Sequence, residues 1–187
     1  MIKIVENDSG STETSYPRME TMDPINWLCA KAPGFQDLSQ DERNAIMHFA
    51  LLSSLFEAAV LDTHACAGSI IEVSKRWENE GRLKAESYAD PLAYFRNRHV
   101  QNNNLTEHFA GLNLRNNDSP ELVEAVLKGE DGNVGDTMAA LLIIVYRLRN
   151  NLFHGVKWDY ELRGQLGNFT NANALLMLAL DVSAPWF

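Results

Sequence analysis

The chain has 187 residues, enough for one domain with a substantial core, and its 45% hydrophobic and 22% charged residues exclude wholesale disorder. The formal net charge of −9 excludes a general polyanion-binding surface, so any contact with nucleic acid must come from a local patch. Cys29 and Cys66 are isolated, which excludes a disulfide framework and favours a reduced, cytoplasmic setting. The longest strongly apolar run, 138–146, is too short to span a bilayer, so we expect no membrane contact.

The N-terminal part of the chain is predicted to differ from the rest. Residues 1–24 are rich in Ser, Thr, Asp and Glu with interrupting prolines, and apolar anchors follow at Ile25, Trp27, Leu28 and Phe35. Residues 1–35 are therefore expected to form a leader that is loosely structured or packed on the domain. We place the domain itself at residues 36–187. Its first helix is expected after Ser39, which can cap it, with Glu42 in the capping-box position. Glu57 lies beside the apolar stripe of this helix, where it is either a boundary charge or a functional group.

Three shorter helical patterns follow, over residues 66–77, 89–100 and 118–129, and the first of them repeats its core-facing residues at three and four. Pro91 and Pro120 fall in the first turns of the second and third patterns, where proline is favoured, and Ser119 can cap the third. The asparagine run at 102–104 marks a break in the chain.

The longest helical pattern is expected to begin at an Asp136 cap and to end at Gly155. Its apolar stripe consists of Met138, Leu141, Leu142, Val145, Leu148 and Leu152. A last pattern covers residues 168–182, and no segment alternates with a period of two residues. The sequence therefore predicts an all-α protein.

The last turns of the longest helix, YRLRNNLFHG, are unusually polar for the end of an apolar stripe. A rotation of about 100° per residue places four of these residues in one arc: Arg147, Asn150, Asn151 and His154. Arg149 lies nearer the opposite side. It can join His154 only if the last turn deviates, or if a partner helix of a dimer supplies the complementary group.

These residue types are sufficient for cleavage of a phosphodiester without a metal or another cofactor. An imidazole can exchange a proton near neutral pH, and a guanidinium matches phosphate oxygens with a permanent charge. RNA supplies its own nucleophile, the 2′-hydroxyl, so the protein needs none. The alternative is an ordinary polar helix end, because cations are also favoured at the negative end of the helix dipole.

The stretch R-N-N-L-F-H, Arg149 to His154, resembles the R-x4-6-H motif of the HEPN superfamily, small helical domains named for higher eukaryotes and prokaryotes nucleotide-binding. A polar residue, often Asn, follows the arginine in that motif, as Asn150 does here. The continuation GVKW at 155–158 is also similar to the family, and residues 49–60 and 94–98 resemble other segments of bacterial members.

The resemblance implies an antiparallel bundle of about four core helices, with extra short helices, that forms a homodimer with both motifs in one cleft. Active members are metal-independent endoribonucleases of toxin–antitoxin, abortive-infection and CRISPR-linked phage-defence systems. By this resemblance His154 is the acid/base group, Arg149 the ligand of the phosphate and transition state, and Asn150 a polar orienter. Arg147 also satisfies the motif at the longer spacing, so either arginine can lead. The candidate substrate-binding residues for RNA are Arg147, Asn151, Arg96 and Arg98.

One position departs from the family pattern. Some members carry a tyrosine before the histidine, which a partner nucleotidyltransferase modifies, whereas this chain has Phe153 and therefore lacks that control at this site. An antitoxin or another regulatory protein remains an expected partner. Two alternatives stay open: a non-catalytic module that binds a nucleotide or a protein, and a purely structural helical subunit.

Overall fold

The computed structural model describes residues 23–130, 132–154 and 162–185. They form an all-α protein, as the sequence predicts. The α-helices are α1 (Pro24–Lys31), α2 (Gln40–Val60), α3 (Ala67–Asn79), α4 (Ala89–His99), α5 (Glu107–Ala110), α6 (Pro120–Lys128), α7 (Val134–Phe153) and α9 (Leu166–Ser183). Short 3-10 helices cover Phe35–Asp37, Ala85–Tyr88 and Asn116–Asp118, and a small hairpin joins β1 (Val100–Gln101) to β2 (Asn104–Leu105).

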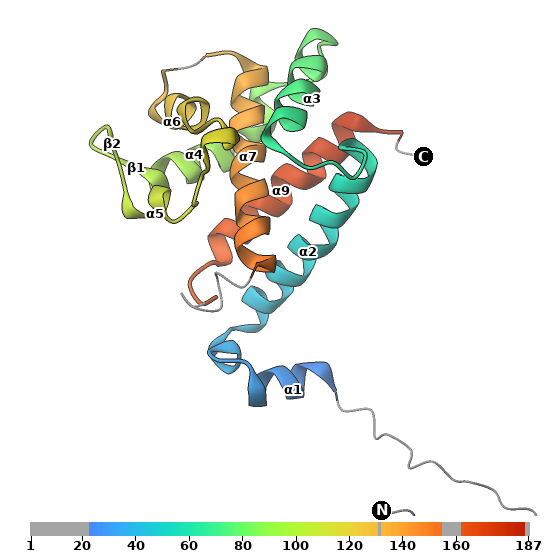
Figure 1. The fold of residues 1–187 in the computed structure, drawn as a ribbon, viewed down its shortest axis with the longest axis vertical. Helices are drawn as coiled ribbons and strands as arrows, with labels where there is room; N and C mark the ends of the chain where they lie inside the picture. The colour runs from blue at the N-terminus through green and yellow to red at the C-terminus, as the bar shows by residue number, and fades with distance from the viewer. Residues whose placement is uncertain (1–22, 131, 155–161, 186–187) are drawn as a thin grey trace, which may run out of the picture.

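The four longest helices form the centre of the bundle, and α7 lies in its middle (Figure 1). The most extensive packing is between α2 and α9 and between α3 and α7. In Figure 1, α7 runs opposite to α3, whereas α2 and α9 point the same way. Helices α4 and α6 cover a further side of the bundle, through contacts with α9 and α7 respectively.

Helix α7 is buried on every side, more completely than one apolar stripe predicts. Its predicted stripe is buried, but so are Ala139, Ala140, Ile143 and Ile144 between the stripe positions. A helix that is apolar all round is typical of the interior of a bundle, where neighbours cover every face. The C-terminal end of this central helix carries the polar residues of interest.

The predicted capping box at the start of α2 is confirmed. The Glu42 N–H donates to Ser39 Oγ at 3.2 Å, and the Ser39 N–H donates to Glu42 Oε2 at 2.9 Å. The other carboxylate oxygen accepts from the Gly164 N–H at 2.7 Å, which ties the start of α2 to the segment before α9. The backbone hydrogen bond from Ser39 is the largest cause that holds the pKa of Glu42 below its ordinary value, and the bond from Gly164 acts in the same direction.

Two predicted helix caps are wrong in detail. Helix α7 begins two residues earlier than Asp136, because Asn133 Oδ1 accepts from the Gly135 and Asp136 N–H groups. Ser119 does precede α6, but its side chain makes no capping hydrogen bond and its φ is 53°. The left-handed backbone at Ser119 replaces the extended conformation that a side-chain cap requires.

The hairpin was not predicted, although the break at 102–104 was. Asn102 and Asn103 have φ values of 50° and 62°, so both central turn residues adopt the left-handed conformation of a type I′ turn. Strands of two residues are too short to show alternation, which explains why the periodicity missed them.

Of the predicted leader, residues 1–22 lie outside the described residues. The rest contains α1, in which Trp27 is 49% exposed, while Leu28 packs against the core. Phe35 is buried. Among the described residues, no helix combines the length and the apolar character needed to cross a membrane.

Candidate functional site

The arc predicted from the helical wheel exists at the end of α7, but most of it faces the interior. Arg147 is 3% exposed, and Asn151 is 2% exposed. The Arg147 Nε–H donates to the Leu112 carbonyl at 3.2 Å, and Asn151 Nδ2 donates to the Gly111 and Leu112 carbonyls, each at 3.2 Å. Both side chains therefore hold the segment that follows α5 against α7.

Arg147 also has a buried ionic partner. Its Nη1 lies 3.2 Å from Asp118 Oδ2, in an ion pair that lacks the alignment of a hydrogen bond. Neither side chain is accessible to a phosphate in this structure. Of the two arginines that fit the motif spacing, only Arg149 is open to solvent.

The Arg149 guanidinium lies at the surface between two helices, with its side chain 31% exposed. Its Nη2 donates to Glu57 Oε2 of α2 at 2.8 Å, and its Nη1 donates to Asn150 Oδ1 at 3.0 Å. The ring of Phe153 lies 5.4 Å from the guanidinium carbon, within the range of a cation–π contact. The structure thus brings Arg149 and Asn150 together, and Asn150 itself is 8% exposed.

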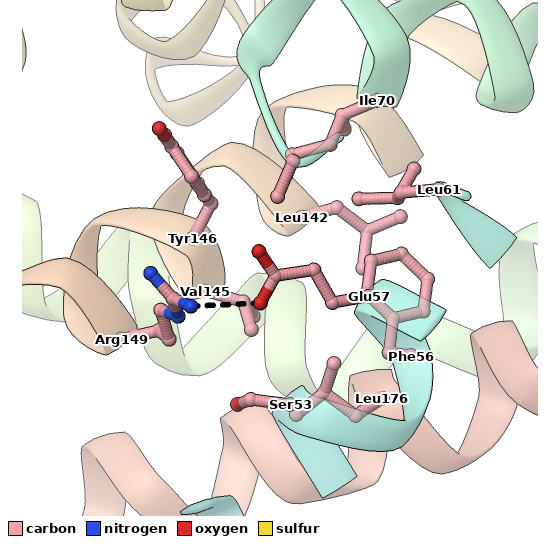
Figure 2. Close-up of a pocket in the computed structure, with 11 residues that line it drawn as sticks. Ser53, Phe56, Glu57, Leu61, Ile70, Leu142, Val145, Tyr146, Arg149 and Leu176 are labelled. Carbon is pink, nitrogen blue, oxygen red and sulfur yellow. Dashed lines mark hydrogen bonds and ion pairs between the residues drawn. The ribbon is translucent and has the colours of Figure 1, made fainter. Parts of the chain in front are cut away.

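The ion pair between Arg149 and Glu57 lies at the rim of a small cavity between α2, α3, α7 and α9 (Figure 2). The cavity has a volume of about 20 Å³, which is room for about one water molecule. Its wall is mostly apolar and includes Phe56, Ile70 and Leu142. Ser53 also lines it, and the buried hydroxyl of this residue has no hydrogen-bond partner among the described residues.

His154 is the residue that ends α7, and its side chain is exposed. Its N–H donates to the Asn150 carbonyl at 3.0 Å, which fixes its backbone to the last helical turn. Within the described part of the chain, no hydrogen bond joins the His154 ring to the Arg149 guanidinium. Residues 155–158, the GVKW continuation of the motif, lie outside the described residues.

The two arginines of α4 have partners of their own. Arg96 donates from Nε and Nη2 to the Val126 carbonyl, at 3.1 Å and 2.9 Å, near the end of α6. Arg98 lies beside Tyr94. Burial raises the pKa of the Tyr94 hydroxyl, whereas the nearby Arg98 guanidinium acts in the opposite direction and lowers it. As far as the described residues show, no hydrogen bond or ion pair links either arginine to the end of α7.

The sequence predicts Glu57 as a boundary charge or a functional group, but it does not identify its partner Arg149, which lies 92 residues away in the chain. In the sequence, Glu57 lies beside an apolar stripe. This position indicates a charge at the boundary of the buried face, but it does not show which residue pairs with it. Phe153 was read only as a missing tyrosine, whereas its ring packs on the guanidinium and remains 55% exposed. No group of three His, Cys, Asp or Glu residues within the described ranges is placed to hold a metal ion.

No protein-family model matches this chain, and neither a curated protein sequence nor a solved structure matches it significantly. Evidence for the function therefore comes from the geometry at the end of α7.

Proposed function

We propose that this protein is a metal-independent endoribonuclease of the HEPN type. The observation that supports the proposal most is the accessible Arg149 guanidinium, held beside Asn150 on the helix end that also presents His154. A cationic fork and an imidazole within one helical turn and a half are sufficient for RNA cleavage without a metal, because they supply charge stabilisation and proton transfer. Arg149, rather than the buried Arg147, is the leading arginine of this proposal.

The proposed reaction uses the RNA as its own nucleophile. His154 accepts the proton of a 2′-hydroxyl, and the 2′-oxygen forms a bond to the adjacent phosphorus. The bond from phosphorus to the 5′-oxygen breaks, and that oxygen takes up a proton, leaving a 2′,3′-cyclic phosphate and a 5′-hydroxyl. Arg149 stabilises the charge on the non-bridging oxygens, and general acid–base catalysis by His154 contributes roughly 10²–10⁴-fold.

The proposal includes a homodimer. Arg149 and His154 are five residues apart, so on a regular helix they point about 140° away from each other. A two-fold cleft solves this problem, because Arg149 of one copy can face His154 of the other. The exposed Phe153 ring between these residues offers an apolar contact for such an interface.

The biological setting belongs to the proposal as well. We propose action in the cytoplasm, where Cys29 and Cys66, both free in the structure, stay reduced. Phage defence or toxin–antitoxin growth arrest are the proposed roles, with an antitoxin or regulatory protein as partner.

The first experiment is incubation of the purified protein with a mixed RNA pool in EDTA. His154→Ala is expected to lower the cleavage rate at least 10²-fold, because the acid/base group is lost. His48→Ala, which removes another exposed histidine, is the matched control and is expected to cleave like the wild type. Undiminished cleavage by His154→Ala would exclude the proposed role of this residue.

A second candidate is a non-catalytic module that binds a nucleotide or a protein. One observation favours it: Glu57 already neutralises the accessible guanidinium, in a chain with a net charge of −9. Binding of RNA gains from many phosphate contacts, which such a surface offers poorly. Nucleotide binding by calorimetry, with no cleavage of any RNA, would support this module over the ribonuclease.

A further inference from the structure

The Arg149 side chain is held by three neighbours, of which two belong to its own helix. Asn150 and Phe153 are both on the last turns of α7, so they move with Arg149 if this helix end moves. Glu57 comes from α2 and is the one neighbour of the three that connects the guanidinium to another helix. The position of the guanidinium relative to the rest of the bundle therefore depends on Glu57.

The surroundings of Glu57 strengthen this ion pair. Its side chain is 23% exposed and lies over the apolar cavity shown in Figure 2, beside Phe56 and Leu61. A carboxylate that is partly removed from water, with apolar groups on one side, attracts an opposite charge more strongly than a fully hydrated one. The pair thus differs from that of Arg82 and Glu80, whose side chains are 36% and 46% exposed and whose closest atoms are 3.4 Å apart.

The remaining donors of the guanidinium make no hydrogen bond among the described residues. An arginine has five N–H donors, and the contacts with Glu57 and Asn150 use two of them, one on each terminal nitrogen. The other three are enough for a phosphate held by two parallel hydrogen bonds. Glu57 therefore occupies one side of the guanidinium without closing it to a ligand.

We propose that Glu57 is a positioning residue for Arg149, an inference that rests on the proposed ribonuclease function. Its carboxylate holds Nη2 from the side of the bundle, so that the free donors face the RNA phosphate. The same negative charge weakens the attraction between Arg149 and RNA. Glu57 thereby increases the fraction of bound RNA that is correctly oriented, at the expense of binding strength.

Two substitutions separate these effects. Glu57→Gln keeps an oxygen that accepts from Nη2 but removes the charge, so KM is expected to fall several-fold while kcat stays within about twofold. Glu57→Ala removes both, so kcat is expected to fall roughly 10- to 100-fold because Arg149 is no longer oriented. A residue with a merely structural role would change kcat equally in both variants, and that result would overturn the inference.

A second measurement does not depend on RNA. Phenylglyoxal modifies accessible guanidinium groups, and peptide mass spectrometry gives the rate at each arginine in folded protein. Arg149 is expected to react several-fold faster in Glu57→Ala than in the wild type, with Glu57→Gln between them. The matched control is Arg82 in Glu80→Gln, where the rate is expected to change little because exposed pairs contribute little.

The two measurements distinguish the two ways in which the proposals can fail. Equal modification rates of Arg149 in the wild type and both Glu57 variants would overturn the positioning inference, whatever the protein does to RNA. Suppose instead that Arg149 is modified faster in the variants and the wild type does not cleave RNA. That result would overturn the proposed function, and it would confirm that the contact with Glu57 holds the guanidinium. Circular dichroism of each variant verifies that it is folded.

Discussion

At Arg147, one buried guanidinium connects the end of α7 to two points of the 112–118 segment, the Leu112 carbonyl and the Asp118 carboxylate. Removing one partner of a buried ion pair leaves the other charge uncompensated. We therefore expect Arg147→Met to lower the free energy of unfolding by about 3–5 kcal/mol in urea titrations. The double variant with Asp118→Asn is expected to recover part of this loss, because no unpaired charge remains.

The exposed Arg76 of α3 provides the control for this prediction. Arg76→Met removes a charge of the same type from a solvated surface, where substitutions usually change stability by less than about 0.5 kcal/mol. An equal, small effect at both arginines would contradict the structural role of Arg147. It would also reopen its role as a ligand of phosphate.

The comparison of these residues shows what the helical wheel can and cannot predict. The spacing of Arg147 and Asn151 was sufficient to place them on one face of the helix. The direction of that face was not predictable, because the carbonyls that the two side chains bind come from a segment 35 to 40 positions earlier in the chain. Arg147 and Asn151 were predicted to bind RNA, which requires access to solvent, whereas here they satisfy buried backbone groups.

At the scale of the elements, α4 and α9 approach closely at Gly167. A Cβ at this position would lie 2.6 Å from the Tyr94 hydroxyl and 2.8 Å from two atoms of its ring. The ring is rigid, and its hydroxyl donates to Asn168 Oδ1 at 3.0 Å, so it cannot move without losing that bond. Gly167→Ala is expected to lower the free energy of unfolding by about 1 kcal/mol or more, because the overlap outweighs the gain in helix propensity.

Gly135, in the first turn of α7, is the matched control for Gly167. A Cβ there meets the Glu78 carboxylate at 2.6 Å, but this group ends a flexible side chain that can turn away. It also meets Asn133 Oδ1, the cap of α7, at 3.2 Å, which requires a shift of only a few tenths of an ångström. Gly135→Ala is therefore expected to be neutral or to stabilise by up to about 1 kcal/mol. Thermal or urea unfolding of both variants tests the contrast, and an equal loss at both glycines would contradict the importance of the Tyr94 ring.

The elements themselves were mostly predictable from local patterns. The capping box at Ser39 and the apolar spacing of α3 and α9 are local signals, and the structure confirms these helices. The burial of α7 on all sides was missed because it depends on neighbours far away in the sequence. The cap at Asn133 was missed because Asp136 offers the same side-chain chemistry three residues later.

At the scale of the whole molecule, the proposed dimer makes a prediction about mixtures of inactive variants. If Arg149 and His154 act from different copies, a dimer of one Arg149→Ala chain and one His154→Ala chain contains one intact pair. Equal amounts of the two variants, unfolded and refolded together, form about half of their dimers from one chain of each kind. Each mixed dimer has one intact site out of two, so the mixture is expected to recover about a quarter of the wild-type cleavage rate.

Native mass spectrometry of the same mixture measures how much mixed dimer is present. Cleavage that stays at the level of the separate variants, in a sample that contains mixed dimers, would contradict a site shared between copies. Recovery in the mixture, by contrast, would exclude a site formed within one chain.

The burial of α7 on every side has a consequence for how the protein opens. Amide groups in the middle of a helix that is covered all round exchange with solvent only when the surrounding helices separate, so they belong to the most protected cooperative unit of the molecule. The candidate site, which begins at Arg149, lies on the last turns of α7, beyond the fully covered middle of the helix. Local fraying at the helix end therefore has little length over which to spread, and it can open the site while the rest of the bundle stays folded.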